Sequence, residues 1–238
     1  MSANVEKTVR ELAVENPAST RIFESLGIDY CCGGGKSLRA ACDAAKLDLN
    51  RVISLLDEKP LKPGERKWAT EPLSELIQHI VDKHHVFTRN EINRLELLLN
   101  KVCGVHGKNH PELLKIHDHF TGLSQELKLH MMKEEQILFP YICRMEEAAV
   151  ENHPMVPAPF GTVQHPVRMM VMEHDSAGES LSAIKEASND YSAPADACIS
   201  YKTLYAALKE FEADLHQHIH LENNILFPRA IAVEEKIR

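Results

Sequence analysis

Two short stretches of the chain share a histidine, a glutamate four residues later and a following Ile-Leu-Phe-Pro run. The first contains His130 and Glu134, and the second contains His218 and Glu222. Residues four apart lie on the same face of a helix, so each copy directs one imidazole and one carboxylate the same way. Two such pairs facing each other would form a carboxylate-bridged pocket for two transition-metal ions.

Two further histidines extend the repeat. His85 precedes His130 by 45 residues, and His174 precedes His218 by 44. Each half therefore reads as a helix with one histidine, followed by a helix with a His-x-x-x-Glu pair. A helical hairpin used twice predicts a site with approximate two-fold symmetry, built from four imidazoles and two carboxylates. Di-iron proteins use such donors in bundle cores, and the set suits iron or manganese, although zinc and copper also bind imidazole.

Four long helices must position these donors. Apolar residues recur at intervals of three and four over roughly 77–99, 113–141, 167–184 and 204–225. Each stripe contains a histidine at mid-span, and the pattern is that of core faces in a four-helix bundle. The hydrophobic content of 44% with 5% aromatic residues also suits a helical protein with an aliphatic core. We therefore expect an all-α protein with a bundle over residues 70–238.

A smaller helical unit is predicted over residues 1–60. We expect helices at the Thr8-Val9-Arg10-Glu11 capping box, from Asn16-Pro17 to Gly27, and over 38–46 and 49–58. Pro60, Pro63 and Gly64 then indicate a linker to the bundle. A unit of about sixty residues is marginal by itself, so docking or formation of a homodimer is expected.

Adjacent cysteines followed by three glycines predict a turn in this unit. Cys31 and Cys32 are candidates for redox chemistry or iron transfer, because the backbone N–H groups of Gly33–Gly35 could favour a thiolate. The alternative is two small residues that fill a tight turn. The remaining cysteines are interpreted as small hydrophobic residues: Cys42, Cys103, Cys143 and Cys198.

Composition excludes several classes of function. A net charge of -8 and a pI near 6.0 argue against a nucleic-acid partner or an anionic membrane surface. No apolar run approaches the roughly 20 residues of a membrane span, and the first residues do not read as a signal peptide. The cysteine spacing is not that of a disulfide framework. A cytoplasmic protein is the simplest expectation.

The other histidines are assigned elsewhere. His216 and His220 share a helix face with polar residues, so we expect both at the surface. His106 lies 21 residues beyond His85, roughly 30 Å along a straight helix, and is left out of the site. His84 is the alternative ligand in the first helix.

Residues around the site could assist it. Glu126 and Glu173 could orient ligands or relay protons, or could be ordinary helix charges. The proline-rich segment 147–165 is expected to be a loop, either a lid over the site or a crossover connection.

The repeated His-x-x-x-Glu…Phe-Pro pattern resembles the hemerythrin-like superfamily. With the unit Leu26-Gly27-Ile28-Asp29-Tyr30-Cys31-Cys32-Gly33-Gly34, the chain resembles more narrowly the iron–sulfur cluster repair family, Repair of Iron Centres of the ScdA type. The resemblance covers nearly the whole chain. It implies an ScdA-type N-terminal domain over 1–60 and a hemerythrin-like di-iron bundle over 70–238.

The resemblance also implies a function. Such a protein repairs iron–sulfur clusters damaged by nitrosative or oxidative stress, by supplying iron from an oxo- or hydroxo-bridged di-iron centre that binds NO or O2. The implied ligands are His85, His130, Glu134, His174, His218 and Glu222, and the implied partners are apo or damaged iron–sulfur proteins. An O2 or NO carrier or sensor, and a nitric oxide reductase or peroxidase, are the alternatives.

Overall fold

The computed structural model describes residues 5–31, 33–58, 67–153 and 159–237, and over these residues the chain is helical. The N-terminal part contains four short helices: α1 (Val9–Glu15), α2 (Ser19–Leu26), α3 (Leu38–Ala44) and α4 (Leu49–Glu58). Their ends follow the sequence signals. Thr8 and Glu11 form the expected capping box at α1, and Gly27 ends α2 with a left-handed backbone. The predicted linker at Pro60, Pro63 and Gly64 lies outside the described residues.

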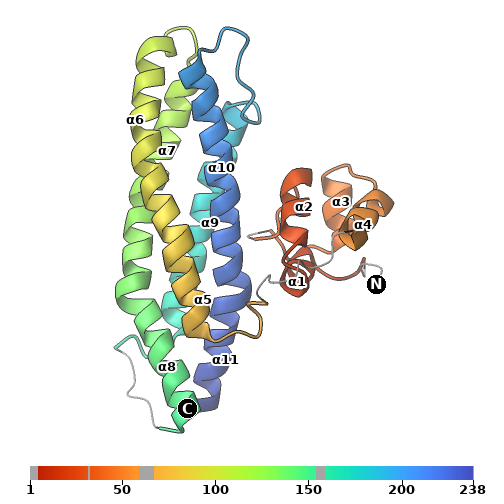
Figure 1. Ribbon diagram of the computed structural model, residues 1–238, viewed down its shortest axis with the longest axis vertical. Helices are drawn as coiled ribbons and strands as arrows, with labels where there is room; N and C mark the ends of the chain where they lie inside the picture. The colour runs from red at the N-terminus through yellow and green to blue at the C-terminus, as the bar shows by residue number, and fades with distance from the viewer. Residues whose placement is uncertain (1–4, 32, 59–66, 154–158, 238) are drawn as a thin grey trace.

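Four helical rods form an elongated bundle (Figure 1). Three of the rods contain a π-helical turn between two α-helices. The rods are, in order, α5 (Leu73–His79), η1 (Ile80–His85) and α6 (Val86–His106); α7 (Glu112–Lys133), η2 (Glu134–Leu138) and α8 (Phe139–Glu151); α9 (Gln164–Ala187); and α10 (Ile199–Leu221), η3 (Glu222–Leu226) and α11 (Phe227–Ile237). This is the all-α bundle that the apolar stripes predict.

The apolar core of the bundle is divided into two clusters. One cluster ends at Ile80 on the first rod, and the other begins at Ile92. The same break falls between Leu127 and Leu138 on the second rod. Because the interruptions lie at one level, a polar layer separates the two halves of the core.

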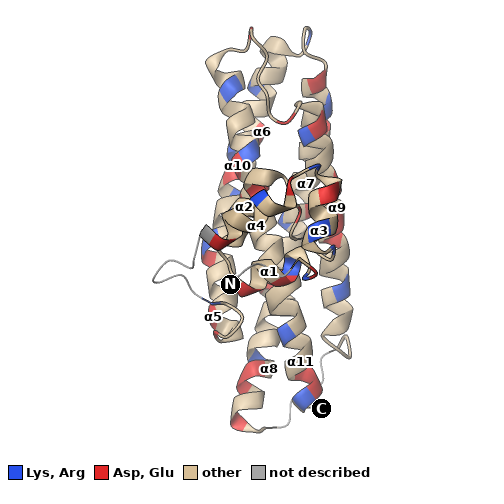
Figure 2. Ribbon diagram, turned by 90° about the vertical axis from the view of Figure 1, so that its right-hand side faces the viewer, with Lys and Arg blue, Asp and Glu red and all other residues tan. Residues whose placement is uncertain are grey.

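The N-terminal unit has its own core, which includes Phe23 and Tyr30, and it lies against the side of the bundle near α10 and η3 (Figures 1 and 2). Asn224 of η3 donates to the carbonyl of Tyr30 at 3.1 Å, and Gln217 of α10 donates to Glu24 at 3.1 Å. The unit is thus docked through polar contacts as well as apolar ones.

The segment before α9 is helical in part where a loop was predicted. Residues 147–151 were expected in a loop, but α8 continues to Glu151 and Asn152 ends it with a left-handed backbone. Near this end of α8, the carboxylate of Glu146 accepts from the N–H groups of Leu73 and Ser74 at the start of α5, which joins the two helices. Residues 154–158 of the predicted lid lie outside the described part of the chain.

Charges of both signs are interspersed along the bundle (Figure 2). None of the helices in the described ranges is both long enough and apolar enough to cross a membrane.

A buried glutamate fixes the start of α9. Glu234 of α11 is 4% exposed and accepts from the Val163 N–H at 2.9 Å and from the Thr162 hydroxyl at 2.6 Å. The hydroxyl of Tyr141 also donates to it, at 3.3 Å. This one carboxylate therefore ties α8, α9 and α11 together.

We expect Glu234→Ala to lower the free energy of unfolding by about 2 kcal/mol, because a buried backbone donor loses its acceptor. Urea denaturation measures the change. Glu235→Ala is the matched control, since Glu235 is exposed on the same helix and should shift stability by less than about 0.5 kcal/mol. Equal effects of the two substitutions would contradict this role of Glu234.

Candidate metal centre

The three π-helical turns each contain one of the six predicted ligands. Turn η1 ends at His85, η2 begins at Glu134 and η3 begins at Glu222. A π turn inserts one extra residue into a helix and often occurs at functional sites. In this bundle, the extra residue of each turn changes which side chains point inward, beside a residue of the polar layer.

The six predicted donors come together in this layer. None is more than 2% exposed. Their donor atoms form two groups in which all atoms lie within 4.8 Å of one another: His85, Glu134, His218 and Glu222 in one, and His130, Glu134, His174 and Glu222 in the other. Each group has two imidazoles, and the two carboxylates belong to both.

The carboxylates lie between the two pairs of imidazoles. Glu134 Oε2 is 3.4 Å from His85 Nε2 and 3.3 Å from His130 Nε2. Glu222 Oε1 is 3.0 Å from His218 Nε2, and its Oε2 is 3.1 Å from His174 Nε2. Each carboxylate therefore contacts imidazoles of both groups, which is the arrangement of a bridging ligand.

Hydrogen bonds at Nδ1, the ring nitrogen that points away from the carboxylates, hold three of the imidazoles in place. His85 Nδ1 donates to Glu135 at 2.6 Å, and His174 Nδ1 donates to Asn223 at 2.8 Å. Such bonds leave the Nε2 lone pairs of these neutral rings directed at the centre.

The third orienting bond joins His130 Nδ1 to Glu173 at 2.8 Å, and Lys133 also contacts this carboxylate. The fourth imidazole differs. Within the described part of the chain, Nδ1 of His218 has no hydrogen-bond partner, and the ring stacks on that of His84 at 5.8 Å.

Charge in the layer stabilises the ionised carboxylates. Burial alone opposes their ionisation, but the adjacent imidazoles outweigh it and hold the pKa of Glu134 below, and that of Glu222 well below, the usual value. Burial also opposes protonation of His130, yet the charge of Glu134 raises the pKa of this imidazole to about 9. Burial dominates at His218 and lowers its pKa.

Hydrogen bonding among the described residues leaves part of this layer unsatisfied. Neither carboxylate oxygen of Glu134 has a hydrogen-bond donor, and neither does Oε2 of Glu222. Buried oxygens without donors are costly, and a cation bound between them would satisfy both. The residues present therefore fit a bound metal pair.

Other predictions near the site have mixed outcomes. Glu173 contacts His130, whereas Glu126 is exposed and accepts from Ser176 instead. His84 is buried beside the site, but it belongs to neither donor group and donates through Nδ1 to Asp214 at 3.0 Å.

The expectation that His220 lies at the surface is wrong. This residue is 4% exposed, because the ring of Tyr30 from the N-terminal unit packs on it edge-on at 5.3 Å. Burial lowers its pKa to about 4. His216 is half-buried, and the supposedly solvated face also includes Glu212, which is 8% exposed.

Sequence reasoning also missed two of the orienting residues, although a signal was present. Glu135 and Asn223 each follow the glutamate of one repeat copy, and each accepts from the first histidine of its own half. Aligning the two copies of the repeat places Glu135 and Asn223 at the same position, and this equivalence was the signal.

Of the two predicted cysteines, Cys31 is described and Cys32 lies outside the described residues. Cys31 is 1% exposed and packs with the bundle core. Asp29 accepts from the Cys31 backbone N–H at 2.9 Å, from its thiol at 3.3 Å and from the Gly33 N–H at 2.8 Å. A side chain at Gly34 would meet the carbonyl of Tyr30 at 2.5 Å, so this position requires glycine.

The other cysteines were all interpreted as small hydrophobic residues. That is wrong for Cys198, which is exposed and lies 3.2 Å from His106 at the far end of the bundle. His106 is thus remote from the polar layer, as the helix length predicts.

Comparison with known proteins agrees with both parts of the chain. Residues 76–230 match the hemerythrin HHE cation binding domain. Residues 5–59 match ScdA_N, a domain of unknown function. Together with the His/Glu layer, the first match identifies a cation-binding bundle.

Relatives align over almost the full length. The chain is 36% identical to the probable iron–sulfur cluster repair protein of Haemophilus influenzae, over 95% of this chain and 97% of that protein. It is 37% identical to the iron–sulfur cluster repair protein YtfE of Citrobacter koseri, over 96% and 98%. The corresponding protein of Escherichia coli is 36% identical, with the same coverage. The chain therefore belongs to the hemerythrin-like family of iron–sulfur cluster repair proteins.

Proposed function

We propose that this protein repairs damaged iron–sulfur clusters by donating iron held in the His/Glu layer of its bundle. The observation that carries the proposal is the pair of buried carboxylates shared between two groups of imidazoles. Relatives that align over nearly the whole chain are named iron–sulfur cluster repair proteins, which supports the same use of the site.

The proposed ligands divide into two sets. His85 and His218 would hold one iron, His130 and His174 would hold the other, and the two glutamates would serve both. Imidazole and carboxylate are donors that iron accepts, and an iron pair supplies redox chemistry together with positions for small ligands such as NO or O2.

Four protein donors for each ion also favour release. An octahedral ion takes six donors, so this protein would not saturate either iron. A hydrogen bond at Nδ1 orients His85, His130 and His174, whereas Nδ1 of His218 has no partner among the described residues, so His218 is the less rigidly held ligand. We further propose that residues 1–60 and 70–238 act as two domains, with Cys31 and Cys32 of the first handing iron to an apo acceptor.

Glu134→Leu and Glu222→Leu should each reduce bound iron from near two per chain to below one, because each removes a ligand from both ions. Metal analysis after anaerobic loading with Fe²⁺ measures this. Glu126→Leu is the control, since Glu126 is exposed on the same rod. Undiminished iron in both carboxylate variants would refute the ligand assignment.

Metal uptake should depend on pH with a defined sign. Metal binds only the neutral imidazole, and His130 has a pKa raised to about 9, so binding at lower pH must displace a proton. We expect the apparent affinity for Co²⁺ to rise by up to about tenfold per pH unit from pH 7 to 9 and then to level off.

A Co²⁺ titration followed by visible absorption at several pH values tests this. His130→Gln should weaken binding and flatten the dependence, whereas His119→Gln, at an exposed position, should preserve it. A flat profile in the unmodified protein would contradict the assignment of His130.

Delivery itself is tested by mixing the iron-loaded protein with an apo iron–sulfur protein and sulfide. We expect iron loss to coincide with the appearance of cluster absorption in the acceptor. Replacing Cys31 and Cys32 with serine should slow delivery several-fold without lowering iron content, whereas Cys198→Ser should not. Unchanged delivery in the double variant would remove the cysteines from the mechanism.

The alternatives predict other outcomes in the same assay. Reversible NO or O2 binding with full retention of iron would instead indicate a carrier or sensor. Sustained consumption of NO or peroxide without delivery would indicate an enzyme.

A further inference from the structure

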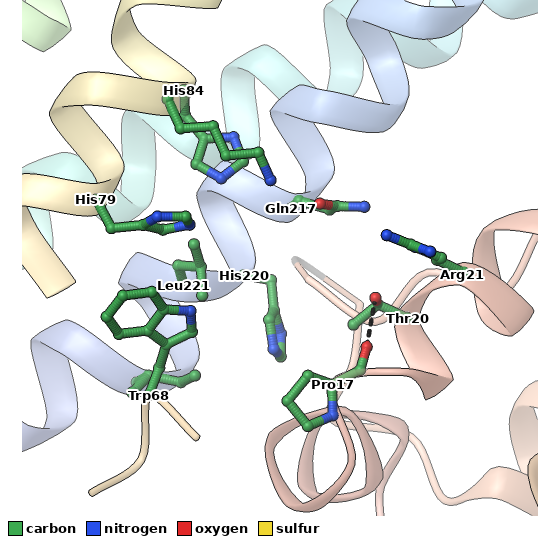
Figure 3. Close-up of a pocket in the computed structure, with 11 residues that line it drawn as sticks. Pro17, Thr20, Arg21, Trp68, His79, His84, Gln217, His220 and Leu221 are labelled. Atoms are coloured by element: carbon green, nitrogen blue, oxygen red, sulfur yellow. Dashed lines mark hydrogen bonds between the residues drawn. The ribbon is translucent and has the colours of Figure 1, made fainter. Parts of the chain in front are cut away.

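A second site lies beside the metal layer, in a pocket between the N-terminal unit and the bundle (Figure 3). The pocket has a volume of about 200 Å³, which is smaller than the roughly 300 Å³ at which drug-sized ligand sites begin. Residues of α2 line one side, and residues of η1, α10 and η3 line the other. A ligand here would therefore be small and would touch both units.

The pocket carries positive charge. Arg21 and Lys83 line it from opposite sides, and neither forms an ion pair with any residue in the described ranges. Figure 3 shows the guanidinium of Arg21 directed toward Gln217, across the opening. Thr20 lies in the first turn of α2, where the helix dipole is positive, and Pro17 lies just before this helix. Among the described residues, no aspartate or glutamate lines the pocket and none of its histidines belongs to a group of donors that could hold a metal ion, so the two cations favour an anion.

A buried imidazole in the lining sets a second requirement for the ligand. His84 is 0% exposed and lines the pocket, and its Nε2 has no partner among the described residues. Asp214 can only accept and lies 3.0 Å from Nδ1, so the tautomer with the proton on Nδ1 fits this contact. Nε2 is then a hydrogen-bond acceptor. A ligand that satisfies it must bring a donor, such as a hydroxyl group.

We propose that this pocket binds a compact dianion that also carries a hydroxyl group, either an organic hydroxycarboxylate or hydrogen phosphate. The cations take its charged oxygens, and Nε2 of His84 accepts from its hydroxyl. Because Arg21 belongs to the N-terminal unit and the other two residues belong to the bundle, the bound anion strengthens the docking of the two parts. This site is separate from the metal layer, and its test does not depend on iron transfer.

The chain offers a built-in reporter. Trp68 is the single tryptophan of the sequence, is 8% exposed and lines the pocket with its ring 4.5 Å from that of His79. We would titrate the full-length protein with L-malate, succinate, phosphate and sulfate at constant ionic strength and follow tryptophan emission, with calorimetry as the second measurement. Malate differs from succinate, and hydrogen phosphate from sulfate, by a hydroxyl group.

We expect saturable binding of malate, of phosphate or of both, about tenfold tighter than succinate or sulfate respectively. Malate alone would identify the organic source of the anion, and phosphate alone the inorganic one. The double variant Arg21→Gln with Lys83→Gln should weaken binding by at least about tenfold. The matched control, Arg51→Gln with Lys202→Gln, removes two exposed charges elsewhere and should leave affinity unchanged.

Three results would overturn the proposal. These are no saturable binding by either measurement, equal affinity for the anions with and without a hydroxyl group, and unchanged affinity in the pocket double variant. Both double variants change only exposed residues, and an unchanged melting temperature without ligand verifies that each is folded.

Discussion

Glu134 and Glu222 carry two negative charges into the apolar interior of the bundle, where no lysine or arginine in the described ranges pairs with either. Within the described part of the chain, the side chains that pair with them are imidazoles. Bringing carboxylates out of water is expensive unless opposite charge or metal compensates for the lost hydration. The bundle meets this requirement with four histidines at one level, and its apolar core divides into two clusters around that level. The rest of the architecture follows from keeping this layer dry and aligned.

The approximate two-fold symmetry of the layer comes from the sequence repeat, and its imperfections have physical consequences. Glu173 precedes His174 and orients His130 of the other half. The matching position before His85 is His84, which stacks on His218 instead of accepting a bond from it. His218 is consequently the imidazole held least firmly through its outer nitrogen. Nδ1 of His84 bonds to Asp214, and the ring lines the pocket beside the N-terminal unit. The position at which the two halves differ therefore lies between the polar layer and the interface with the N-terminal unit.

The N-terminal unit is held to the bundle by specific side-chain contacts. Asp29 of this unit accepts from the backbone N–H groups of Cys31 and Gly33 and from the Cys31 thiol. Tyr30 then covers His220 of the bundle, and its carbonyl accepts from Asn224. A unit of this size has a small core of its own, and the contacts with the bundle supplement it.

Local sequence patterns were enough to predict the helices and the six side chains that converge in the polar layer. Helix periodicity places apolar residues and donors on one face, and caps at Thr8 and Gly27 act through neighbours along the chain. Tertiary structure alone decided that His220 is buried and that Cys198 is exposed. It also brought Arg21 of the N-terminal unit to one pocket with Lys83 and His84 of the bundle. These outcomes depend on contacts such as that between Tyr30 and Asn224, which lie 194 residues apart, and no local pattern encodes which surface a docked unit will cover.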